Sequence, residues 1–232
     1  AGSSRAFLAR DEEFAPSTMR SWQEVSYRKL RLLDKKLEFT IDLSNVGCGC
    51  NAAAYLVEMG DTSSSVMSSD YCDIQGFDSP DIRPCVELDL IEGNRKAVQA
   101  TLHTQQGRGQ NGRCNQDGCK GPPFGRDNSE RVYGPSGSAR INSDLPFRVT
   151  ASFPSTRDGA WLDVGLSQGG SSSNDRVMLL EGSQSMNLRA GRPPLAISDD
   201  DQRRALQSLQ NGLVLVVSLW TSKDLKWLDG GC

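Results

Sequence analysis

The chain has 232 residues, of which 37% are hydrophobic and 24% charged, with a formal net charge of −3 at pH 7 and an isoelectric point near 5.3. The acidic balance argues against nucleic acid as a partner, and no apolar run reaches the roughly 18 to 20 residues needed to span a bilayer. The first residues lack the apolar stretch of a secretory signal, so we expect any such peptide to have been removed.

The N-terminal half contains three segments with the pattern of strands. Residues 37–43 alternate strictly between apolar and polar side chains, which predicts a strand with one buried face. Residues 53–59 and 86–91 are predicted to be further strands. Before them, residues 21–31 form a weak helix candidate, for which a solvated connector is the favoured alternative.

The C-terminal half contains more strands and one well-marked helix. Ser198 can cap a helix whose first turn carries three aspartates, suited to the positive end of its dipole, and Gly212 is expected to end that helix in a left-handed turn. Residues 212–220 are nearly all apolar, which predicts a central strand covered on both faces. The other predicted strands are residues 147–153, 161–166, 176–180 and 185–190.

Glycine-rich turns and loops connect these segments. The chain has 23 glycines, as expected for many strands joined by turns, and residues 104–128 and 167–175 are predicted to be loops rich in Gly, Asn and Ser. No linker divides the sequence. We therefore predict an all-β protein with one short helix and long loops, in a single β-sandwich domain over residues 1–232.

Cysteine is abundant, with seven residues in the chain. The spacing of Cys48 and Cys50 is too tight for the usual zinc-ligand pair, and His103 is the single histidine. We therefore expect disulfide bonds in an oxidising compartment, and no metal or other cofactor. The odd number leaves at least one thiol free or paired with another chain.

An acidic block points most directly to chemistry. Glu87, Asp89 and Glu92 lie within six residues of a predicted strand, where burial of carboxylates is costly. Neighbouring carboxyls with separated pKa values are what the cleavage of a glycosidic bond requires. Taken alone, the block is better explained as a solvated acidic edge strand, but the surrounding sequence reverses that preference.

Motifs along nearly the whole chain carry a family resemblance. Residues 48–55 read Cys-Gly-Cys-Asn-Ala-Ala-Ala-Tyr, which is similar to a Cys-Gly-Leu-Asn-Gly-Ala-Leu-Tyr segment of glycoside hydrolase family 7, the fungal-type cellobiohydrolases and endoglucanases. Further segments follow in the order of that family: residues 4–8, 27–33, 37–45, 71–73, 87–94, 114–119, 133–137, 216–220 and 227–229. Compared with the family, the sequence lacks the opening strands and almost everything after the last motif, which implies a minimal version of the fold or a processed piece of a longer chain.

The resemblance implies a concanavalin-like jelly roll with a concave substrate-binding face. It also implies a retaining hydrolase of β-1,4-glucan chains, with Glu87 as the nucleophile, Asp89 as its helper and Glu92 as the acid/base. Several loops that roof the family's substrate tunnel are short or missing, so we expect endo action in an open cleft rather than processive cleavage.

Strand geometry adds an independent prediction about the acidic block. Glu87 and Asp89 share a face because side chains alternate along a strand, whereas Glu92 is five positions after Glu87 and would point the other way. A β-bulge or bend near residues 90–91 would return Glu92 to the same face, so we predict a local irregularity there. A retaining mechanism then requires about 5 to 5.5 Å between the two catalytic carboxyls.

By the same resemblance, six further residues are candidates for substrate contacts, and each has a structural alternative. His103 matches a cleft histidine of the family, against a purely structural role. Trp220 and Trp227 are candidates for stacking on sugar rings, against core packing. The other three match residues near the family's cleft floor: Tyr55, Asn51 and Asp73.

The resemblance also implies a set of disulfide bonds. The expected pairs are Cys72–Cys85, Cys48–Cys232 and Cys114–Cys119. In the family, Cys114 and Cys119 correspond to cysteines with other partners, and those partners are missing from this sequence. The five-residue separation of Cys114 and Cys119 allows them to bond to each other. Cys50 is then the expected free thiol.

Two alternatives to an enzyme stay open. The chain is either a non-catalytic relative that serves as a carbohydrate-binding or structural module, or a subunit whose protein partner covers a sheet edge left exposed by missing strands. Retention of all three carboxylates favours the enzyme. We expect a polysaccharide as its ligand, no membrane span, and a location that is secreted or otherwise oxidising, such as the cell wall or an organelle lumen.

Overall fold

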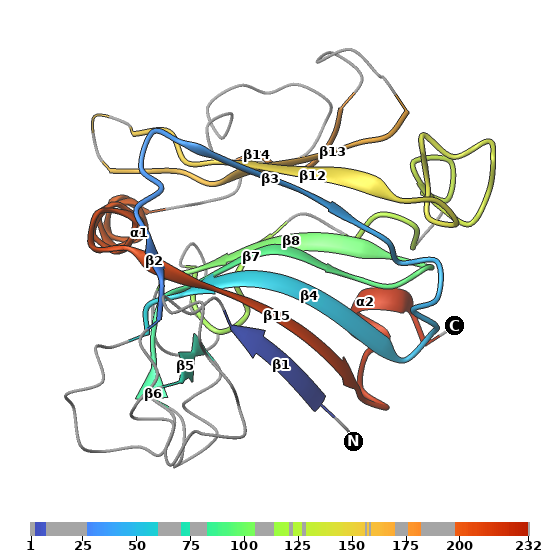
Figure 1. The fold of residues 1–232 in the computed structure, drawn as a ribbon, viewed down its shortest axis with the longest axis horizontal. Helices are drawn as coiled ribbons and strands as arrows, with labels where there is room; N and C mark the ends of the chain where they lie inside the picture. The colour runs from blue at the N-terminus through green and yellow to red at the C-terminus, as the bar shows by residue number, and fades with distance from the viewer. Residues whose placement is uncertain are drawn as a thin grey trace.

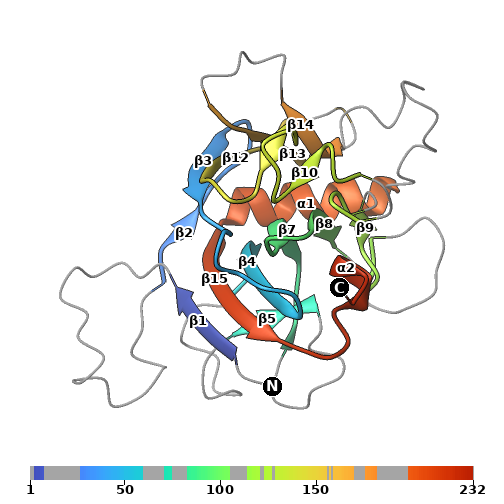
Figure 2. The ribbon, with the colours of Figure 1, turned by 90° about the vertical axis from the view of Figure 1, so that its right-hand side faces the viewer.

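The computed structural model describes residues 3–7, 27–59, 71–74, 83–104, 114–120, 123–126, 129–155, 157, 159–169, 176–181 and 198–231. Two β-sheets are stacked face to face, and a helix lies across one end of the stack (Figure 1). Figure 2 shows the same layers along the strands, with the helix at the far end. The predicted all-β sandwich is therefore confirmed.

The larger sheet has seven strands in the order β1-β15-β4-β7-β8-β9, with β2 also paired to β15. All of its pairings are antiparallel. Its strands are β1 (Ser3–Phe7), β2 (Lys29–Leu30), β4 (Cys50–Val57), β7 (Glu87–Gly93), β8 (Val98–His103), β9 (Cys119–Lys120) and β15 (Leu213–Thr221).

The smaller sheet has four antiparallel strands in the order β14-β13-β12-β3. They are β3 (Lys36–Ile41), β12 (Phe147–Ser152), β13 (Asp163–Ser167) and β14 (Val177–Glu181). The alternating apolar residues that predicted strands 37–43 and 147–153 belong to the same core cluster as residues of β7, so they face the larger sheet. These strands agree with the sequence-based predictions to within a few residues.

Two short parallel pairs and two helices complete the described structure. The pairs are β5 (Cys72–Asp73) with β6 (Arg83–Pro84), and β10 (Tyr133–Gly134) with β11 (Ile141–Asn142). The helices are α1 (Asp199–Asn211) and α2 (Lys226–Asp229). Among the described residues, no helix has the length and apolar character needed to cross a membrane.

The larger sheet carries hydrophobic clusters on both of its faces. Between the sheets, Leu88 and Leu90 of β7 belong to the same core cluster as Phe147 and Val149 of β12. On the outer face, Tyr55 belongs to a second cluster that includes residues of β15 and of the β5 segment. Figure 1 shows β5 and β6 on this outer side. The larger sheet is therefore a middle layer, and its outer face is partly covered.

Helix α1 begins where the sequence predicted. Ser198 accepts a hydrogen bond from the backbone N–H of Asp201, and the side chain of Asp201 accepts one in return from the backbone N–H of Ser198. This capping box satisfies donors that have no partner inside the helix. Gly212 ends the helix with φ 97° and ψ 141°, so the predicted left-handed turn is wrong in detail: φ is positive, but ψ is extended because the chain enters β15 directly.

Three other expectations need correction or lie outside the described residues. Residues 29–30 form β2, not part of a helix, because they pair with β15; the rest of the weak helix candidate before residue 27 lies outside the described residues, as does the predicted strand 185–190. Strand β15 is central, between β1 and β4, but it is not covered on both faces. Its Val217 and Leu219 are 51% and 49% exposed, since the smaller sheet ends at β3 in the part of the chain that the structure describes.

Two of the expected disulfides are present among the described residues. Cys72 is bonded to Cys85 and Cys114 to Cys119, with Cα–Cα distances of 5.7 and 4.7 Å. Cys48 is also in a disulfide bond, and its expected partner, Cys232, lies outside the described residues. Cys50 is a free thiol in this part of the chain, as predicted.

Candidate active site

The acidic block lies on β7, and the strand contains the predicted irregularity. The register of β7 shifts against β8 between Asp89 and Glu92, and it shifts against β4 at the same level. Leu90 and Ile91 both belong to the core between the sheets, so two successive residues occupy one face. The bulge therefore restores Glu92 to the face of Glu87 and Asp89, which confirms the prediction.

Cross-strand pairing places the three carboxyls in three neighbouring rows of the outer face. Glu87 lies opposite His103 of β8. Asp89 lies between Tyr55 of β4 and Thr101 of β8. The row of Glu92 runs from Arg5 across Ser218 and Ala53 to Gln99.

Glu87 and Asp89 are almost completely buried, at 8% and 5% exposure. Burial and then the charge of Asp89 raise the pKa of Glu87 well above its usual range. Burial and then the charge of Glu92 do the same for the pKa of Asp89. The backbone N–H of Ile74 donates to Glu87 Oε2 at 2.9 Å, which favours the ionised form of this one carboxyl. The carboxyls therefore titrate as an interacting set and not as independent groups.

Glu92 is half-buried, and its Oε1 accepts a hydrogen bond from Asn51 Nδ2 at 3.0 Å. Burial raises the pKa of Glu92, while His103, Asn51, Lys120 and Gln99 counteract it in that order. A raised pKa is the property that a general acid needs near neutral pH. Asn51, which the sequence suggested as a substrate contact at the cleft floor, is fully buried. It is a direct hydrogen-bond partner of the candidate acid.

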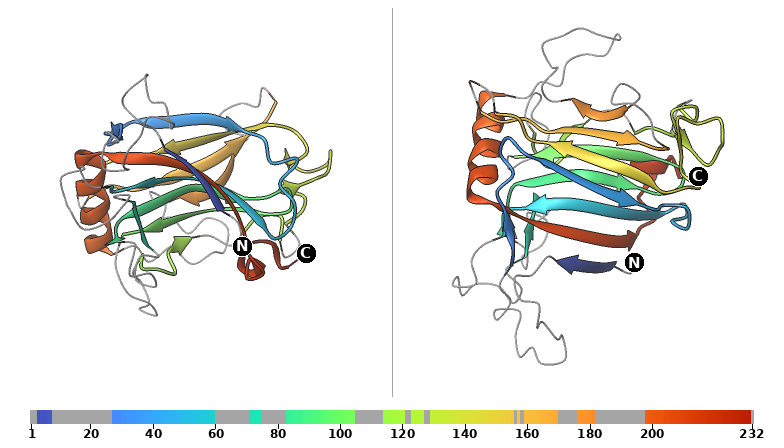
Figure 3. Two further views of the ribbon diagram at one scale, coloured as in Figure 1. Left: turned by 60° about the horizontal axis from the view of Figure 1, so that its bottom comes forward. Right: turned by 45° about the horizontal axis from the view of Figure 1, so that its top comes forward.

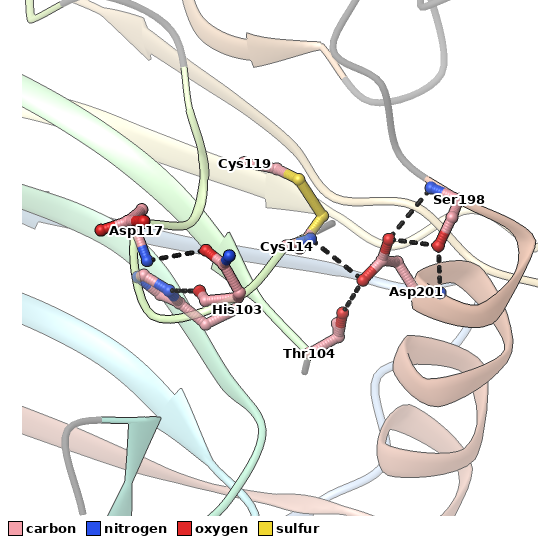
Figure 4. Close-up of a disulfide and its surroundings, with 8 residues drawn as sticks. His103, Thr104, Cys114, Asp117, Cys119, Ser198 and Asp201 are labelled. Atoms are coloured by element: carbon pink, nitrogen blue, oxygen red, sulfur yellow. Dashed lines mark hydrogen bonds between the residues drawn. A yellow bond between two sulfur atoms is a disulfide. The ribbon is translucent and has the colours of Figure 1, made fainter. Parts of the chain in front are cut away.

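His103 lies between a carboxyl and a backbone carbonyl. Its Nε2 is 3.3 Å from Asp89 Oδ2, and its Nδ1 is 2.6 Å from the carbonyl oxygen of Asn115. Figure 4 shows the ring beside the segment that carries Asp117. At 6% exposure, His103 reaches the site as a partner of Asp89. His103 therefore belongs to the same cluster of side chains as the carboxyls, and its contact with substrate stays a prediction.

The side of the site nearest Glu87 contains a second polar cluster. The hydroxyls of Tyr55 and Tyr71 are 2.9 Å apart, and Arg5 donates from Nε to Tyr55 at 3.3 Å while stacking over the Tyr71 ring. Burial raises the pKa of both tyrosines, so both stay protonated as donors. Asp73 is 6% exposed, and its charge contributes to the raised pKa of Glu87.

The two candidate stacking residues lie at the other end of the sheet. Trp220 is on β15, where it pairs with Asn51 of β4, and Trp227 is on α2. Both are half-buried and pack against Leu225 and Leu228. The ammonium of Lys120 lies 5.6 Å from the centre of the Trp227 ring. Each indole thus packs against the α2 segment and keeps part of its surface exposed; stacking on sugar rings stays a prediction.

Several residues of the site were not found from the sequence. On β8 the polar Gln99 and Thr101 alternate with the apolar Ala100 and Leu102, and all four are buried. This alternation of polar and apolar residues could have predicted β8 as a strand with one polar face. Lys120, which offsets the negative charge of Asp89 and Glu92, has no signal in its local sequence. Among the described residues, no group of three or more His, Cys, Asp or Glu side chains is arranged to hold a metal ion.

Comparisons with known proteins point to the family suggested by the motifs. The model of glycosyl hydrolase family 7 matches residues 18–77. The chain is 25% identical over 263 aligned residues to endo-beta-1,4-glucanase celB of Emericella nidulans, covering 90% of this chain and 59% of that protein. It is 26% identical to endoglucanase type C of Fusarium oxysporum, covering 88% of this chain and 57% of that protein. The chain therefore spans a little more than half the length of these relatives.

Solved structures show the same fold. An endoglucanase I complexed with cellobiose superposes with a TM-score of 0.64 at 22% identity, covering 87% of this chain and 60% of that one. The native structure of the endocellulase EGI of Humicola insolens gives a TM-score of 0.63 at 21% identity, covering 97% of this chain and 67% of that one. In sequence and in fold, the chain is similar to glycosyl hydrolase family 7.

Proposed function

We propose that the chain hydrolyses β-1,4-glucan chains by double displacement with retention of configuration. The observation that supports this most strongly is the grouping of Glu87, Asp89 and Glu92 on one face of β7 by a bulge. A bulge that buries two successive apolar residues and gathers three carboxyls is costly for folding alone. The endoglucanases similar in sequence to this chain supply the substrate class.

In this proposal each carboxyl has a distinct role. The Glu87 carboxylate attacks the anomeric carbon while Glu92 donates its proton to the departing glycosidic oxygen, which leaves a glycosyl ester on Glu87. Glu92, now ionised, removes a proton from a water molecule that attacks the same carbon, and Glu87 leaves as a carboxylate. Asp89 holds His103, and His103 together with the backbone N–H of Ile74 counteracts the raised pKa of Glu87 and so favours its carboxylate.

Other parts of the site would bind the sugar chain. Trp220 and Trp227 offer their open ring surfaces to sugar faces at one end of the sheet, while Tyr55 and Asp73 form the polar floor. Asn51, which is fully buried, acts from beneath that floor through Glu92. We propose endo action in an oxidising, extracytoplasmic location, supported by the disulfides among the described residues and by the endoglucanase names of the relatives. Residues 1–232 are proposed to act as one domain.

The decisive experiment compares the chain with its Glu87→Gln variant for release of reducing ends from a soluble β-1,4-glucan. Activity that is lost in the variant supports the proposed role of Glu87. Glu58→Gln is a suitable control, because Glu58 lies just after β4 and outside the carboxylate rows. A folded protein that releases no reducing ends would instead favour the non-catalytic carbohydrate-binding alternative.

A specific observation also supports a protein partner. Val217 and Leu219 are exposed on the side of β15 that faces the smaller sheet, and the inward side chains of β3 are only half-buried. We propose that a strand from another polypeptide, with apolar residues at alternate positions, adds to β3 and covers this strip. This partner would be on the opposite face of the larger sheet from the carboxylates.

A further inference from the structure

The disulfide between Cys114 and Cys119 closes a short loop directly against His103. The loop connects Cys114 to β9, which pairs with β8 at Thr101 and Leu102. Its Gly118 has φ +72°, and a Cβ built there would lie 2.6 Å from His103 Cε1 and 2.2 Å from Thr101 Cγ2. The loop is therefore packed too closely on the imidazole ring to admit any side chain at Gly118.

The hydrogen bonds of this loop determine which nitrogen of His103 carries a proton. The carbonyl of Asn115 can only accept, so the 2.6 Å contact requires a proton on Nδ1. Nε2 then faces Asp89 Oδ2 at 3.3 Å. By occupying Nδ1, the loop therefore determines which nitrogen of His103 meets the Asp89 carboxyl.

Helix α1 anchors the loop through one buried carboxylate. Asp201 is fully buried; its Oδ2 accepts from the backbone and hydroxyl of Ser198, and its Oδ1 accepts from Thr104 Oγ1 at 2.6 Å and the backbone N–H of Cys114 at 3.1 Å. Figure 4 shows this carboxylate between the first turn of the helix and the disulfide, and Figure 3 shows the helix across the ends of the sheets. Thr104 directly follows His103 and Cys114 begins the loop, so Asp201 joins the end of β8 to the loop that packs on the histidine.

A second contact connects the same loop with Glu87. Gln116 donates from Nε2 to the carbonyl of Ile74 at 3.5 Å, and the backbone N–H of Ile74 donates to Glu87 Oε2 at 2.9 Å. Residues 114–119 are therefore connected to two of the three carboxyls, through His103 to Asp89 and through Ile74 to Glu87.

We propose that the Cys114–Cys119 loop, anchored by Asp201, is the positioning element that fixes the tautomer of His103 and so the nitrogen that faces Asp89. This inference rests on the proposed hydrolase function for its consequence on catalysis, but its structural content does not. None of the loop residues needs to touch substrate, because they act through His103 and Ile74.

The test uses the single histidine of the chain, whose imidazole nitrogens give unambiguous signals in a 15N NMR spectrum. We expect Nδ1 to be protonated throughout the pH range in which the protein stays folded, with slow exchange of its proton. A folded chain with Nδ1 unprotonated at neutral pH would overturn the proposal, whether or not the chain hydrolyses a glucan.

A matched pair of glycine variants separates positioning from stability. Gly118→Ala places a methyl group against His103, whereas Gly169→Ala puts the same residue at φ +62° with nothing within 4 Å. We expect Gly118→Ala to alter the His103 signals and to lower kcat by at least about tenfold, with KM within about twofold. Gly169→Ala, with a similar backbone penalty, should leave both unchanged.

The anchors give a second pair of measurements. Cys114→Ser/Cys119→Ser and Asp201→Asn should speed exchange of the Nδ1 proton and shift the pH profile of activity, while Asp199→Asn, an exposed residue of the same helical turn, should do neither. Unchanged histidine signals in both Gly118→Ala and Asp201→Asn would overturn the proposal. If the His103 signals change in these variants but the parent chain has no hydrolase activity, the positioning role of the loop is supported and only the proposed function is rejected.

Discussion

Two regions of the larger sheet reverse the usual distribution of polar and apolar side chains. On the outer face of β7 and β8, Glu87, Asp89 and His103 are buried at 8%, 5% and 6% exposure. On the opposite face of β15, Val217 and Leu219 are about half exposed. Buried charge and exposed apolar surface are the informative exceptions to the ordinary pattern, because each costs stability unless something else requires it.

The two regions differ in whether neighbouring residues hold their side chains in place. Partners from several elements hold the carboxyls: Ile74 for Glu87, His103 for Asp89 and Asn51 for Glu92. The exposed strip of β15 lies beyond β3, which pairs with β12 in the described structure. A fixed network indicates a site that must keep its geometry, whereas an uncovered strip indicates a surface that can accept a partner.

The largest expected effect concerns the division of labour between the two glutamates. Glu87→Gln and Glu92→Gln should each lower kcat on a glucan by about a thousandfold or more, because the nucleophile and the proton donor are both needed. An activated aryl glycoside has a leaving group that needs no proton. On that substrate Glu92→Gln should retain formation of the glycosyl ester, visible as a burst of released phenol, and Glu87→Gln should not. Equal losses on both substrates would contradict the assigned roles.

The next largest effect concerns the disulfide on the outer side of the sheet. Cys72 and Cys85 are 13 residues apart, so removal of this bond as Cys72→Ser/Cys85→Ser should lower the free energy of unfolding by about 3 kcal/mol. The loop between Cys114 and Cys119 is shorter, with a separation of 5, and its removal should cost about 2 kcal/mol. Urea unfolding monitored by tryptophan fluorescence measures both. A larger loss for the shorter loop would show that contacts, and not loop closure, dominate its contribution.

A smaller effect follows from the buried carboxyls themselves. Burial and Asp89 raise the pKa of Glu87 above its unfolded value of about 4.3. The folded state then binds more protons than the unfolded state between the two pKa values, so stability falls as pH rises through this window. Glu87→Gln removes that loss, and we expect it to be more stable than the parent by on the order of 1 kcal/mol at pH 7. The difference should vanish below about pH 4. Thermal unfolding at several pH values checks this, and a variant less stable at pH 7 would contradict it.

Much of this arrangement could be read from periodicity and composition. Strict alternation predicted β3 and β12, and Ser198 with the three aspartates predicted the start of α1. These signals are local, since each depends on residues that are neighbours in the chain. The bulge was predicted from the five-residue offset between Glu87 and Glu92 together with the family resemblance, which implied that both carboxyls belong to one cleft.

Other features depend on contacts that no local pattern records. Asn115 contacts His103 through a backbone carbonyl, which is the same in every residue type. The sequence identifies Asp201 only as a residue of the first helical turn, although one of its carboxylate oxygens accepts hydrogen bonds from Thr104 and Cys114. Coverage of β15 on both faces was predicted from its apolar sequence, but the width of the smaller sheet decides coverage, and that is a property of the whole fold.

The smallest expected effect tests the exposed strip. Val217→Thr/Leu219→Thr should change the free energy of unfolding by less than about 0.5 kcal/mol, because half-exposed side chains contribute little to the core. Leu213→Ala, on the same strand but fully buried, should cost about 2 to 5 kcal/mol. If the strip is a surface for an added strand, the double variant should leave stability and hydrolysis unchanged while it weakens capture of a peptide with alternating apolar residues, measured by fluorescence anisotropy. A loss of stability in the double variant comparable to that of Leu213→Ala would mean that the strip is covered within the chain itself, and the contrast between the two regions would then reduce to the carboxylates alone.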